Sequence, residues 1–485
     1  MDQSKTPLYD KVMEHQKKSP ISFHVPGHKN GSVFNKMGKD IFEQILRIDV
    51  TEIEGMDDLH QPDGVIQEAQ DLAANLYGVK DTFFLVGGST VGNLAAIMSS
   101  LKTGDKVIVQ RNSHQSVFHG IELAGATPVF IHPDVDVETG LSLGVSKYAL
   151  KETIERFPMA KAIILTNPTY EGYGQPLDDH VELAHHAGMI VIIDEAHGAH
   201  LVLKDSHWPV SSIHAGADII IQSAHKMLPA MTMTAFLHIN SSRINKGRVK
   251  NYLRMLQSSS PSYPLMVSLD LGRAYLAKIL ESDWSRMTDH LLQFKEGLNR
   301  GDGWVRSPNR INQYVQDPLK LVFVADEYIS TDTWKEKMES LNVFPELVTP
   351  NHILLTLPLT VDGLATADWT SLMKRSLLGE KNGYVIKRDN IKKFTVNENE
   401  SIFSEAVVPL SQLLEMEVFK VPWTESIGLV AAETITPYPP GIPLIMKGEY
   451  ISEYHIVQLH RHIENKTRFQ TGDSWFKDGI SVVMK

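Results

Sequence analysis

The segment Ser223-Ala224-His225-Lys226 contains a lysine whose position in the sequence suits it to take part in a reaction. It directly follows Asp218-Ile219-Ile220-Ile221, an apolar run that is typical of a buried strand. Because an α/β fold places its reacting groups at the carboxyl ends of its strands, this order predicts an amine at such an end. A lysine there is either a solvated surface charge or a nucleophile that forms a Schiff base with a carbonyl compound. The other groups at the same edge of the sheet must decide between the two.

An acidic segment follows another apolar run. Asp194-Glu195-Ala196-His197 comes directly after residues 190–193. An acid at this point either faces a ligand or caps a helix at a surface turn. The same four residues also spell a motif of ATP-driven helicases, but that class requires an upstream Gly-x-x-x-x-Gly-Lys-Ser/Thr loop, which this sequence lacks. We therefore interpret Asp194 as a candidate ligand-facing acid.

A glycine-rich turn, Gly87-Gly88-Ser89-Thr90-Val91-Gly92-Asn93, follows the apolar run 82–86 and opens a helical stretch. Backbone N–H groups at a helix N-terminus, together with the hydroxyls of Ser89 and Thr90, are suited to binding a phosphate group. Short Gly-Ser turns that cap a helix are also common without any ligand. The turn is therefore a phosphate-site candidate that needs support from its neighbours.

Two polar turns follow further apolar runs. His114 lies in Arg111-Asn112-Ser113-His114-Gln115-Ser116, and its flat ring could stack on a planar ligand, although a lone loop histidine is more often just solvated. We interpret His119, on the helical stretch after it, as structural. Asn167-Pro168-Thr169-Tyr170 is a proline-containing turn that needs no function, but its position at a strand end is consistent with a ligand-facing role.

The elements that must position these residues lie between residues 82 and 237, where apolar runs alternate with helical stretches. The expected strands are residues 82–86, 106–109, 128–131, 162–166, 190–193, 218–221 and 232–237. The expected helices are residues 92–101, 117–123, 148–157 and 181–187. Such alternation predicts an α/β fold with a mainly parallel, seven-stranded sheet that helices cover on both faces.

The remaining parts of the chain predict further domains. Residues 1–60 are turn-rich and predict an N-terminal arm and loop, and residues 61–265 form the large α/β domain. Residues 266–400 predict a smaller α+β domain. Residues 401–485 predict a C-terminal subdomain, which contains Pro437-Tyr438-Pro439-Pro440-Gly441-Ile442-Pro443.

The composition excludes several classes of protein. Of 485 residues, 42% are hydrophobic and 22% are charged, as in ordinary globular proteins, and the net charge of −11 disfavours a nucleic-acid partner. The sequence has no cysteine, so we expect neither disulfides nor a thiolate metal site, and we expect a reducing compartment. No apolar run approaches the roughly 20 residues of a membrane helix, and the first residues lack a signal-peptide core. We therefore expect a cytoplasmic protein that binds no metal and does not contact a membrane.

The candidate residues predict a function more specifically as a set than one by one. In chain order, the strand ends carry a phosphate-type loop, a flat ring, a polar turn, an acid and a lysine. A pyridoxal 5′-phosphate site needs such a set: an anchor for the phosphate, a cover for the ring, an acid that keeps the pyridine nitrogen protonated, and a lysine that forms the Schiff base. The sequence therefore predicts this cofactor.

In these motifs the chain resembles the fold-type-I pyridoxal-phosphate enzymes and, among them, the Orn/Lys/Arg decarboxylase family. The resemblance covers nearly the whole chain, and shorter bacterial members without an N-terminal wing domain are the most similar in architecture. The matching segments, in the order of the family, are His24-Val25-Pro26-Gly27-His28-Lys29, Gly88-Ser89-Thr90, Asn112-Ser113-His114, Asn167-Pro168-Thr169-Tyr170, Asp194-Glu195-Ala196-His197-Gly198, Ser223-Ala224-His225-Lys226 and Pro437-Tyr438-Pro439-Pro440-Gly441-Ile442-Pro443.

The resemblance implies roles for the cofactor-facing residues. Lys226 would carry the cofactor as a Schiff base, Asp194 would pair with the pyridinium nitrogen, and His114 would stack on the ring. The phosphate would be held by Ser89, Thr90, Ser223 and His225. Many members have a lysine after the stacking histidine, where this chain has Gln115.

The resemblance also implies how the site works and assembles. Ala196 would pack under the ring with His197 beside it, and Lys226 or His225 would return a proton after the bond is broken. The family works as a homodimer or as a higher assembly of dimers, with sites at the dimer interface. The implied reaction removes CO2 from arginine, lysine or ornithine and yields a polyamine or its precursor.

Some alternatives stay open from sequence alone. A basic substrate tail needs a carboxylate, for which Glu433 is a candidate across the dimer interface, although a solvated surface acid is the simpler interpretation. The scaffold could also support transamination or elimination, or bind its cofactor without turnover. An aminotransferase usually fixes the α-carboxylate of its substrate with an arginine of the smaller domain. That region contains Arg306, Arg310, Arg375 and Arg388.

Overall fold

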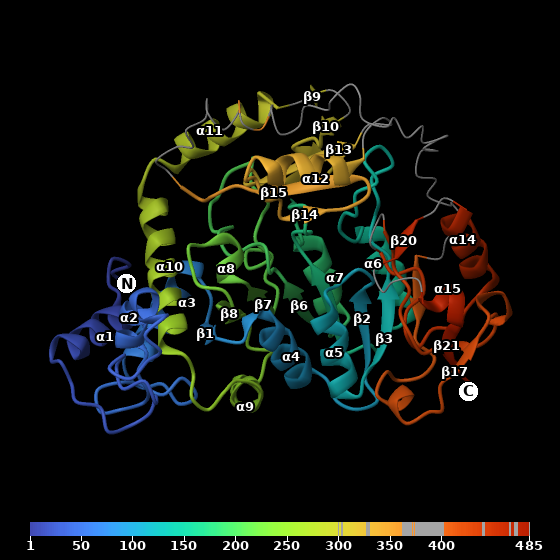
Figure 1. Cartoon of the computed structure of the whole chain (residues 1–485). Coiled ribbons are helices and arrows are strands. Elements are labelled where there is room, and N and C mark those ends of the chain that lie inside the picture. The colour runs from blue at the N-terminus through green and yellow to red at the C-terminus, as the bar shows by residue number, and fades with distance from the viewer. Residues whose placement is uncertain are drawn as a thin grey trace.

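A mixed sheet of eight strands lies at the centre of the computed structural model, which describes residues 1–298, 300–301, 304–325, 330–360, 371, 373, 402–438, 442–464, 467–469 and 474–484 (Figure 1). In spatial order its strands are β1 (Asp81–Leu85), β8 (Ala235–Ile239), β7 (Ile219–Gln222), β6 (Ile190–Asp194), β4 (Ala162–Thr166), β2 (Lys106–Gln110), β3 (Thr127–Ile131) and β16 (Phe403–Glu405). Neighbours from β7 to β3 are parallel. Strand β8 is antiparallel to both β7 and β1, so β1 runs in the same direction as β7. These parallel strands therefore end at one common edge.

The seven predicted strands are confirmed, with boundaries shifted by at most a few residues. Strand β16 was not predicted and extends the sheet to eight strands by pairing antiparallel with β3. It has only three residues, Phe-Ser-Glu, which is too short for a period of two to stand out.

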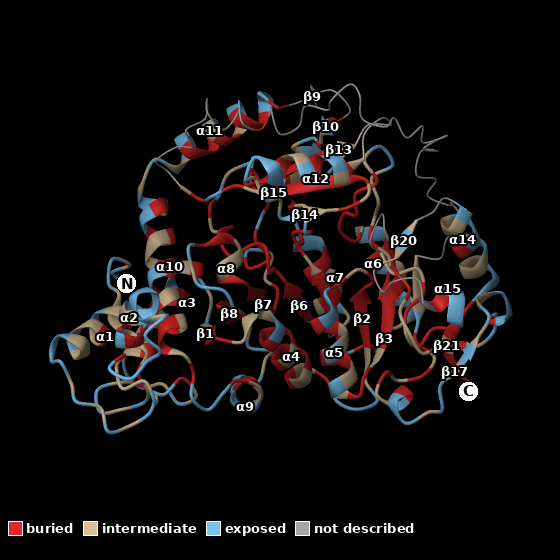
Figure 2. Cartoon of the chain, in the orientation of Figure 1, coloured by how far each residue is buried: buried red, intermediate tan, exposed pale blue. Residues whose placement is uncertain are grey.

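Helices cover both faces of the sheet, because alternate side chains of a strand point to opposite sides. Ile108, Ile163 and Ile220 belong to one buried core, whereas Ile164 and Ile221 belong to the other. The first core is covered by α3 (Val65–Tyr77), α6 (Lys147–Arg156), α7 (Asp178–His186) and α10 (Tyr263–Glu281). The second core is covered by α4 (Gly88–Ser100), α5 (Gln115–Ala124) and α9 (Lys246–Leu256). Figure 2 shows the central strands buried between these layers.

The N-terminal segment, expected as an arm and loop, also contains two helices, α1 (Pro7–Lys17) and α2 (Lys39–Ile48). Helix α1 buries only Leu8 and Val12, which are too few apolar positions to show a helical period in the sequence. The buried Asp270 carboxylate of α10 accepts the backbone N–H of Leu8, which attaches α1 to the large domain.

A smaller domain lies above the carboxyl edge of the main sheet in Figure 1. It contains α11 (Trp284–Glu296), α12 (Thr331–Ser340) and a sheet in the order β14 (Leu347–Val348), β15 (His352–Thr356), β13 (Lys320–Ala325), β10 (Trp304–Arg306) and β9 (Arg300–Gly301). A second small sheet links it to the large domain and consists of β11 (Arg310–Ile311), β12 (Tyr314–Gln316) and β5 (Tyr173–Gly174). Among the described helices, none is both long and apolar enough to cross a membrane.

The C-terminal subdomain, drawn in orange to red in Figure 1, lies beside β3. Its described elements are η1 (Gln412–Leu414), β17 (Phe419–Val421), η2 (Trp423–Glu425), β18 (Val430–Ala431), β19 (Pro437–Tyr438), α14 (Glu453–Glu464), β20 (Arg468–Phe469), α15 (Ser474–Asp478) and β21 (Ile480–Val483). Arg111, directly after β2, and Glu449 form a bidentate ion pair of 2.6 and 2.7 Å, and each side chain is 2% exposed. This buried pair fixes the subdomain next to the turn that carries His114. Pro439, Pro440 and Gly441 of the predicted loop lie outside the described residues.

Candidate active site

The carboxyl edge of the main sheet brings the sequence-predicted residues to one side of the large domain. Asp194 is the last residue of β6, and Lys226 lies on the short helix α8 (Ala224–Met227) that follows the adjacent strand β7. Ser89 and Thr90 lie in the first turn of α4, which follows β1, and His114 is the N-cap of α5, which follows β2. The parallel topology explains this convergence, because all four strands end at the same edge.

Gly92 sets how closely α4 approaches the sheet. A Cβ atom at this position would lie 2.7 Å from Leu85 Cδ1 and 2.9 Å from Ile221 Cγ2. Because such distances are shorter than side chains tolerate, glycine lets the start of α4 lie directly against the ends of β1 and β7. The first turn of α4 is thereby held beside the lysine segment.

Lys226 is partly buried, and its Nζ lies 3.2 Å from Nε2 of the buried His197. Burial lowers the pKa of Lys226, although the carboxylates of Asp194 and Glu346 oppose this shift. A lysine with a lowered pKa spends a larger fraction of time as the neutral amine, which is the form that attacks a carbonyl carbon.

Asp194 is 3% exposed and accepts hydrogen bonds on both carboxylate oxygens. Asn93 Nδ2 donates to Oδ2 at 3.0 Å, and the backbone N–H of Ala196 donates to Oδ1 at 3.2 Å. Within the described part of the chain, no cationic side chain lies at salt-bridge distance from this carboxylate. A buried carboxylate of this kind is suited to a ligand that brings its own positive charge, such as a protonated ring nitrogen.

The ring-covering candidate is connected to the acid. Asn93 Nδ2 also donates to Ser116 Oγ at 2.9 Å, and Ser116 Oγ lies 2.8 Å from Nδ1 of His114. The backbone N–H of Ser116 also donates to the same nitrogen at 3.2 Å. His114 itself is exposed, so one face of its ring is open to a ligand.

The phosphate candidates form a hydroxyl pair at the start of α4. Ser223 Oγ donates to Ser89 Oγ at 2.8 Å, and Thr90 is exposed beside it. Among the described residues, no side chain caps the N-terminus of α4, whose N-cap is Gly87, and Gly88 has a φ of +74°, which favours glycine. The unpaired backbone N–H groups of such a terminus bind anions.

One ring nitrogen of His225 is directed at the backbone and not at the phosphate candidates. Its Nδ1 lies 2.9 Å from the backbone carbonyl oxygen of Thr234, so Nδ1 carries the hydrogen and donates. The neutral ring then presents Nε2 as its acceptor. Only that nitrogen is left to face a ligand.

Sequence reasoning missed a second lysine in this cluster. Lys320, on β13 of the smaller domain, is 1% exposed, and its Nζ lies 3.3 Å from His197 Nδ1 and 3.0 Å from Thr356 Oγ1. Tyr170 contacts the same histidine edge-on with ring centroids 4.6 Å apart, and its hydroxyl donates to Glu346 at 2.6 Å. The available signal was the single charge in the apolar run Leu319-Lys320-Leu321-Val322-Phe323.

Glu433 does not join this cluster within one chain. Its Oε1 accepts the backbone N–H of Ser481 at 2.6 Å, at the start of the last strand of the C-terminal subdomain. Of the four arginines, Arg306 donates to Asn309 and Arg310 to the backbone of Ser206, whereas Arg375 and Arg388 lie outside the described residues.

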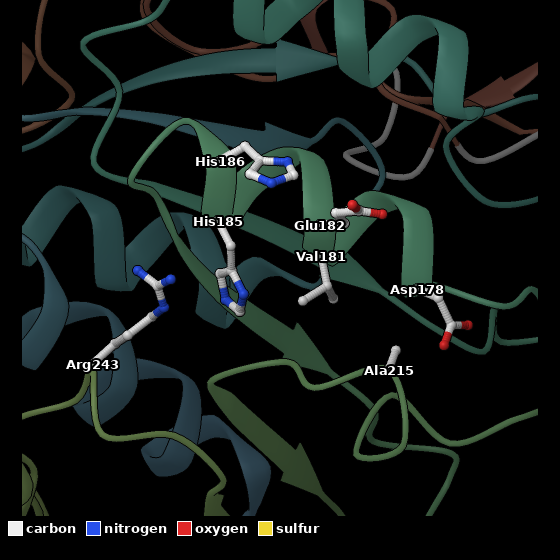
Figure 3. Close-up of a pocket in the computed structure, with 7 residues that line it drawn as sticks. All are labelled: Asp178, Val181, Glu182, His185, His186, Ala215 and Arg243. Carbon is white, nitrogen blue, oxygen red and sulfur yellow. The ribbon is translucent and has the colours of Figure 1, made fainter.

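A separate hollow of about 400 Å³ lies at the amino end of the parallel strands, away from Lys226. Figure 3 shows Val181 and His185 of α7 pointing toward Ala215 and Arg243 across it. His185 Nε2 lies 2.9 Å from the buried Asp218. The hollow is therefore distinct from the cluster at the carboxyl edge.

Comparison with known proteins identifies the family. Residues 6–312 match the family model for the major domain of Orn/Lys/Arg decarboxylases, and residues 395–470 match the model for their C-terminal domain. The chain belongs to the Orn/Lys/Arg decarboxylase family. It is 44% identical over 473 residues to a protein of Bacillus subtilis named uncharacterized protein YaaO, covering 96% of both chains. It is 34% identical to an arginine decarboxylase of the same organism, covering 96% of this chain and 95% of that protein.

Solved structures agree with the family assignment at the level of the fold. The lysine decarboxylase of Francisella novicida superposes with a TM-score of 0.79 at 19% identity, covering 99% of this chain and 81% of that one. The constitutive lysine decarboxylase of Escherichia coli gives a TM-score of 0.77 at 18% identity, covering 100% and 82%. The predicted fold-type-I architecture is therefore confirmed.

Orn/Lys/Arg decarboxylases depend on pyridoxal 5′-phosphate, and the residues at the carboxyl edge fit this cofactor. Lys226 offers an amine for its carbonyl carbon. Asp194 offers a buried carboxylate for its ring nitrogen. The uncapped start of α4, with Ser89 and Ser223, offers N–H and hydroxyl groups for its phosphate.

Proposed function

We propose that this chain removes CO2 from a basic amino acid, namely arginine, lysine or ornithine, and releases a polyamine or a polyamine precursor. The main support is the pairing, at the ends of adjacent parallel strands, of a lysine with a lowered pKa and a buried carboxylate without a cationic partner in the described residues. Membership of the decarboxylase family and its named arginine, lysine and ornithine decarboxylases supports the reaction and the substrate class.

Different side chains would hold different parts of the cofactor. Lys226 Nζ would bind its carbonyl carbon, and Asp194 would stabilise a proton on its ring nitrogen. Ser89, Thr90 and Ser223 would hold its phosphate with the N–H groups of α4. When bound, pyridoxal 5′-phosphate supplies the sink for the electron pair that remains when CO2 leaves.

The remaining groups act around the ring and on the substrate. His114 would cover one face of the cofactor ring, Ala196 would pack under the ring, and His197 would lie beside it. After CO2 has left, Lys226 Nζ or His225 Nε2 donates a proton to the substrate Cα. His225 can do so only while both of its ring nitrogens carry hydrogen, because in the neutral ring the single hydrogen lies on Nδ1 and is donated to the carbonyl of Thr234.

The basic tail of the substrate requires an anionic partner. Glu433 remains our candidate, reaching the site of a second subunit, and the backbone N–H of Ser481 orients its carboxylate. Glu346 is a further acid near the site, because its charge acts on both Lys226 and Lys320 and the Tyr170 hydroxyl holds it.

A panel of amino acids tests the substrate class. The purified enzyme should release CO2 and the matching amine from arginine, lysine or ornithine and from no acidic or aliphatic amino acid. Glu433→Gln keeps the acceptor for Ser481 but removes the charge, so it should raise KM about 10- to 100-fold with little change in kcat. Glu425→Gln, an exposed acid of the same subdomain, is the matched control. Keto acids in place of CO2 would exclude the proposed reaction.

We propose that the enzyme works in the cytoplasm, because a chain without cysteine fits a reducing compartment. We also propose that it assembles as a homodimer. The dimer is supported by an exposed apolar surface on the N-terminal segment, where Phe23 and Met37 are both 94% exposed. Light scattering should therefore give about twice the chain mass of 54.3 kDa, and Phe23→Asp combined with Met37→Asp should give monomers without activity. A fully active wild-type monomer would contradict this assembly.

A further inference from the structure

A buried histidine connects two lysines in the site. His197 Nε2 lies 3.2 Å from Lys226 Nζ, and His197 Nδ1 lies 3.3 Å from Lys320 Nζ. Lys320 is kept from solvent by the loop before β5, where Gly172 has a φ of +89° and a Cβ atom would lie 2.5 Å from Lys320 Cγ. The two amines come from different domains and meet through this one ring.

The hydrogen-bonding capacity of the ring limits the charge of the pair. A neutral imidazole has one N–H group and one lone pair, whereas an ammonium group only donates. Two charged lysines would each require a lone pair on His197, and the ring has only one. Protonation of the ring is disfavoured, because burial and the two lysines lower its pKa well below the usual value. While both hydrogen bonds persist, one lysine is therefore charged and the other is a neutral amine.

The surrounding charges favour neither lysine strongly as the carrier of the positive charge. Burial lowers the pKa of Lys226 and of Lys320. Nearby carboxylates oppose this shift: Asp194 and Glu346 act on Lys226, and Asp317, Glu346 and Glu171 act on Lys320. His200 and His225 also face His197. Neither lysine has a carboxylate at hydrogen-bond distance among the described residues, so no direct ion pair fixes the positive charge on one of them.

We propose that Lys226 and Lys320 share one proton through His197, and that Lys320 takes up the proton which Lys226 must lose before it can capture the cofactor. In one state the Lys226 ammonium donates to Nε2, and Nδ1–H donates to the neutral amine of Lys320. Transfer of one proton from Lys226 to Nε2, and of one from Nδ1 to Lys320, gives the other state. The ring changes tautomer, and the total charge stays the same.

This relay gives Lys320 a role through His197, as a positioning residue. Lys226 must be a neutral amine when it binds the carbonyl carbon, and it becomes a free amine again in each turnover when substrate displaces it. Lys320 is shielded from solvent, so the proton stays within the site and is available for return. The inference rests on the proposed function in that Lys226 is taken as the cofactor-bearing lysine.

The rate of cofactor capture tests the relay without any turnover. The full chain, freed of cofactor, is mixed with pyridoxal 5′-phosphate over a range of pH, and the appearance of the bound-cofactor absorbance is timed. This rate follows the neutral fraction of Lys226. In Lys320→Met the proton acceptor is lost, so capture at neutral pH should slow about tenfold and the midpoint of the rate profile should rise by about one pH unit. In Lys320→Arg a permanent cation keeps Nε2–H directed at Lys226, so capture should match or exceed the wild-type rate.

Two further variants protect the test against a folding defect. His197→Phe retains both lysines and breaks the connection, so its midpoint should also rise. Lys295→Met removes another buried lysine of the same domain, whose pKa burial lowers to about 7 and whose Nζ binds Gln316 and the Lys320 carbonyl instead of His197. Its midpoint should match that of the wild type.

The outcomes separate the relay from the proposed function. Opposite effects of Lys320→Met and Lys320→Arg support the relay, because a purely structural lysine would give the same defect in both. Coincident rate profiles for the wild type, Lys320→Met and His197→Phe would overturn it. If the wild type captures the cofactor at a lysine other than Lys226, then the proposed function fails, whatever the profiles show.

Discussion

Replacing Lys226 with alanine abolishes covalent attachment of the cofactor and lowers decarboxylation by at least about a thousandfold. The structure places this amine on α8, at the end of β7, with a pKa lowered by burial. Alanine removes the amine of α8 that would bind the carbonyl carbon. The absorbance of the lysine-bound cofactor and the rate of CO2 release together measure the effect.

A charge-matched variant serves as the control for this result. Lys226→Arg keeps the positive charge and most of the volume but cannot form the bond, so it should be as inactive as Lys226→Ala. Activity within tenfold of the wild type in either variant would mean that another residue carries the cofactor.

Replacing Asp194 with asparagine should lower kcat by roughly 10²- to 10³-fold while the fold persists. The asparagine keeps one oxygen that can accept from Asn93 or from the backbone of Ala196, so one of the two local hydrogen bonds survives. It removes the negative charge that stabilises a protonated ring nitrogen, and that charge matters most when the electron pair enters the ring. Single-turnover CO2 release and the absorbance of the bound cofactor would measure the loss.

The adjacent acid provides the control for Asp194. Glu195 is fully buried, and its carboxylate accepts from Ser211, Ser212 and Gln222. Glu195→Gln should therefore cost about 1–3 kcal/mol of stability and leave kcat within a few fold. Equal losses of kcat at both positions would contradict a specific electronic role for Asp194.

The large-domain half of the site is predictable from where the parallel strands end. Asp194 ends one parallel strand and Lys226 follows the next, and the convergence of such ends brings them together with the first turn of α4. The alternation of apolar runs and helical stretches was enough to find these strands, because both faces of the sheet are buried.

The smaller-domain half of the site could not be found in this way. Lys320 and Glu346 lie far along the chain from Lys226 and reach it only through the packing of β13 and the segment before β14 over the edge of the main sheet. No local motif records such a contact. The domain boundaries at residues 60, 265 and 400 stay a prediction.

The most direct test of the account is the location of the cofactor. Borohydride reduction of the holoenzyme fixes the cofactor to the amine that carries it, and mass spectrometry of the digested chain identifies the modified peptide. We expect the added mass on the peptide that contains Lys226, and none on peptides that contain Lys320 or Lys295. A modified lysine elsewhere, with Lys226 unmodified, would contradict the assignment of the active site.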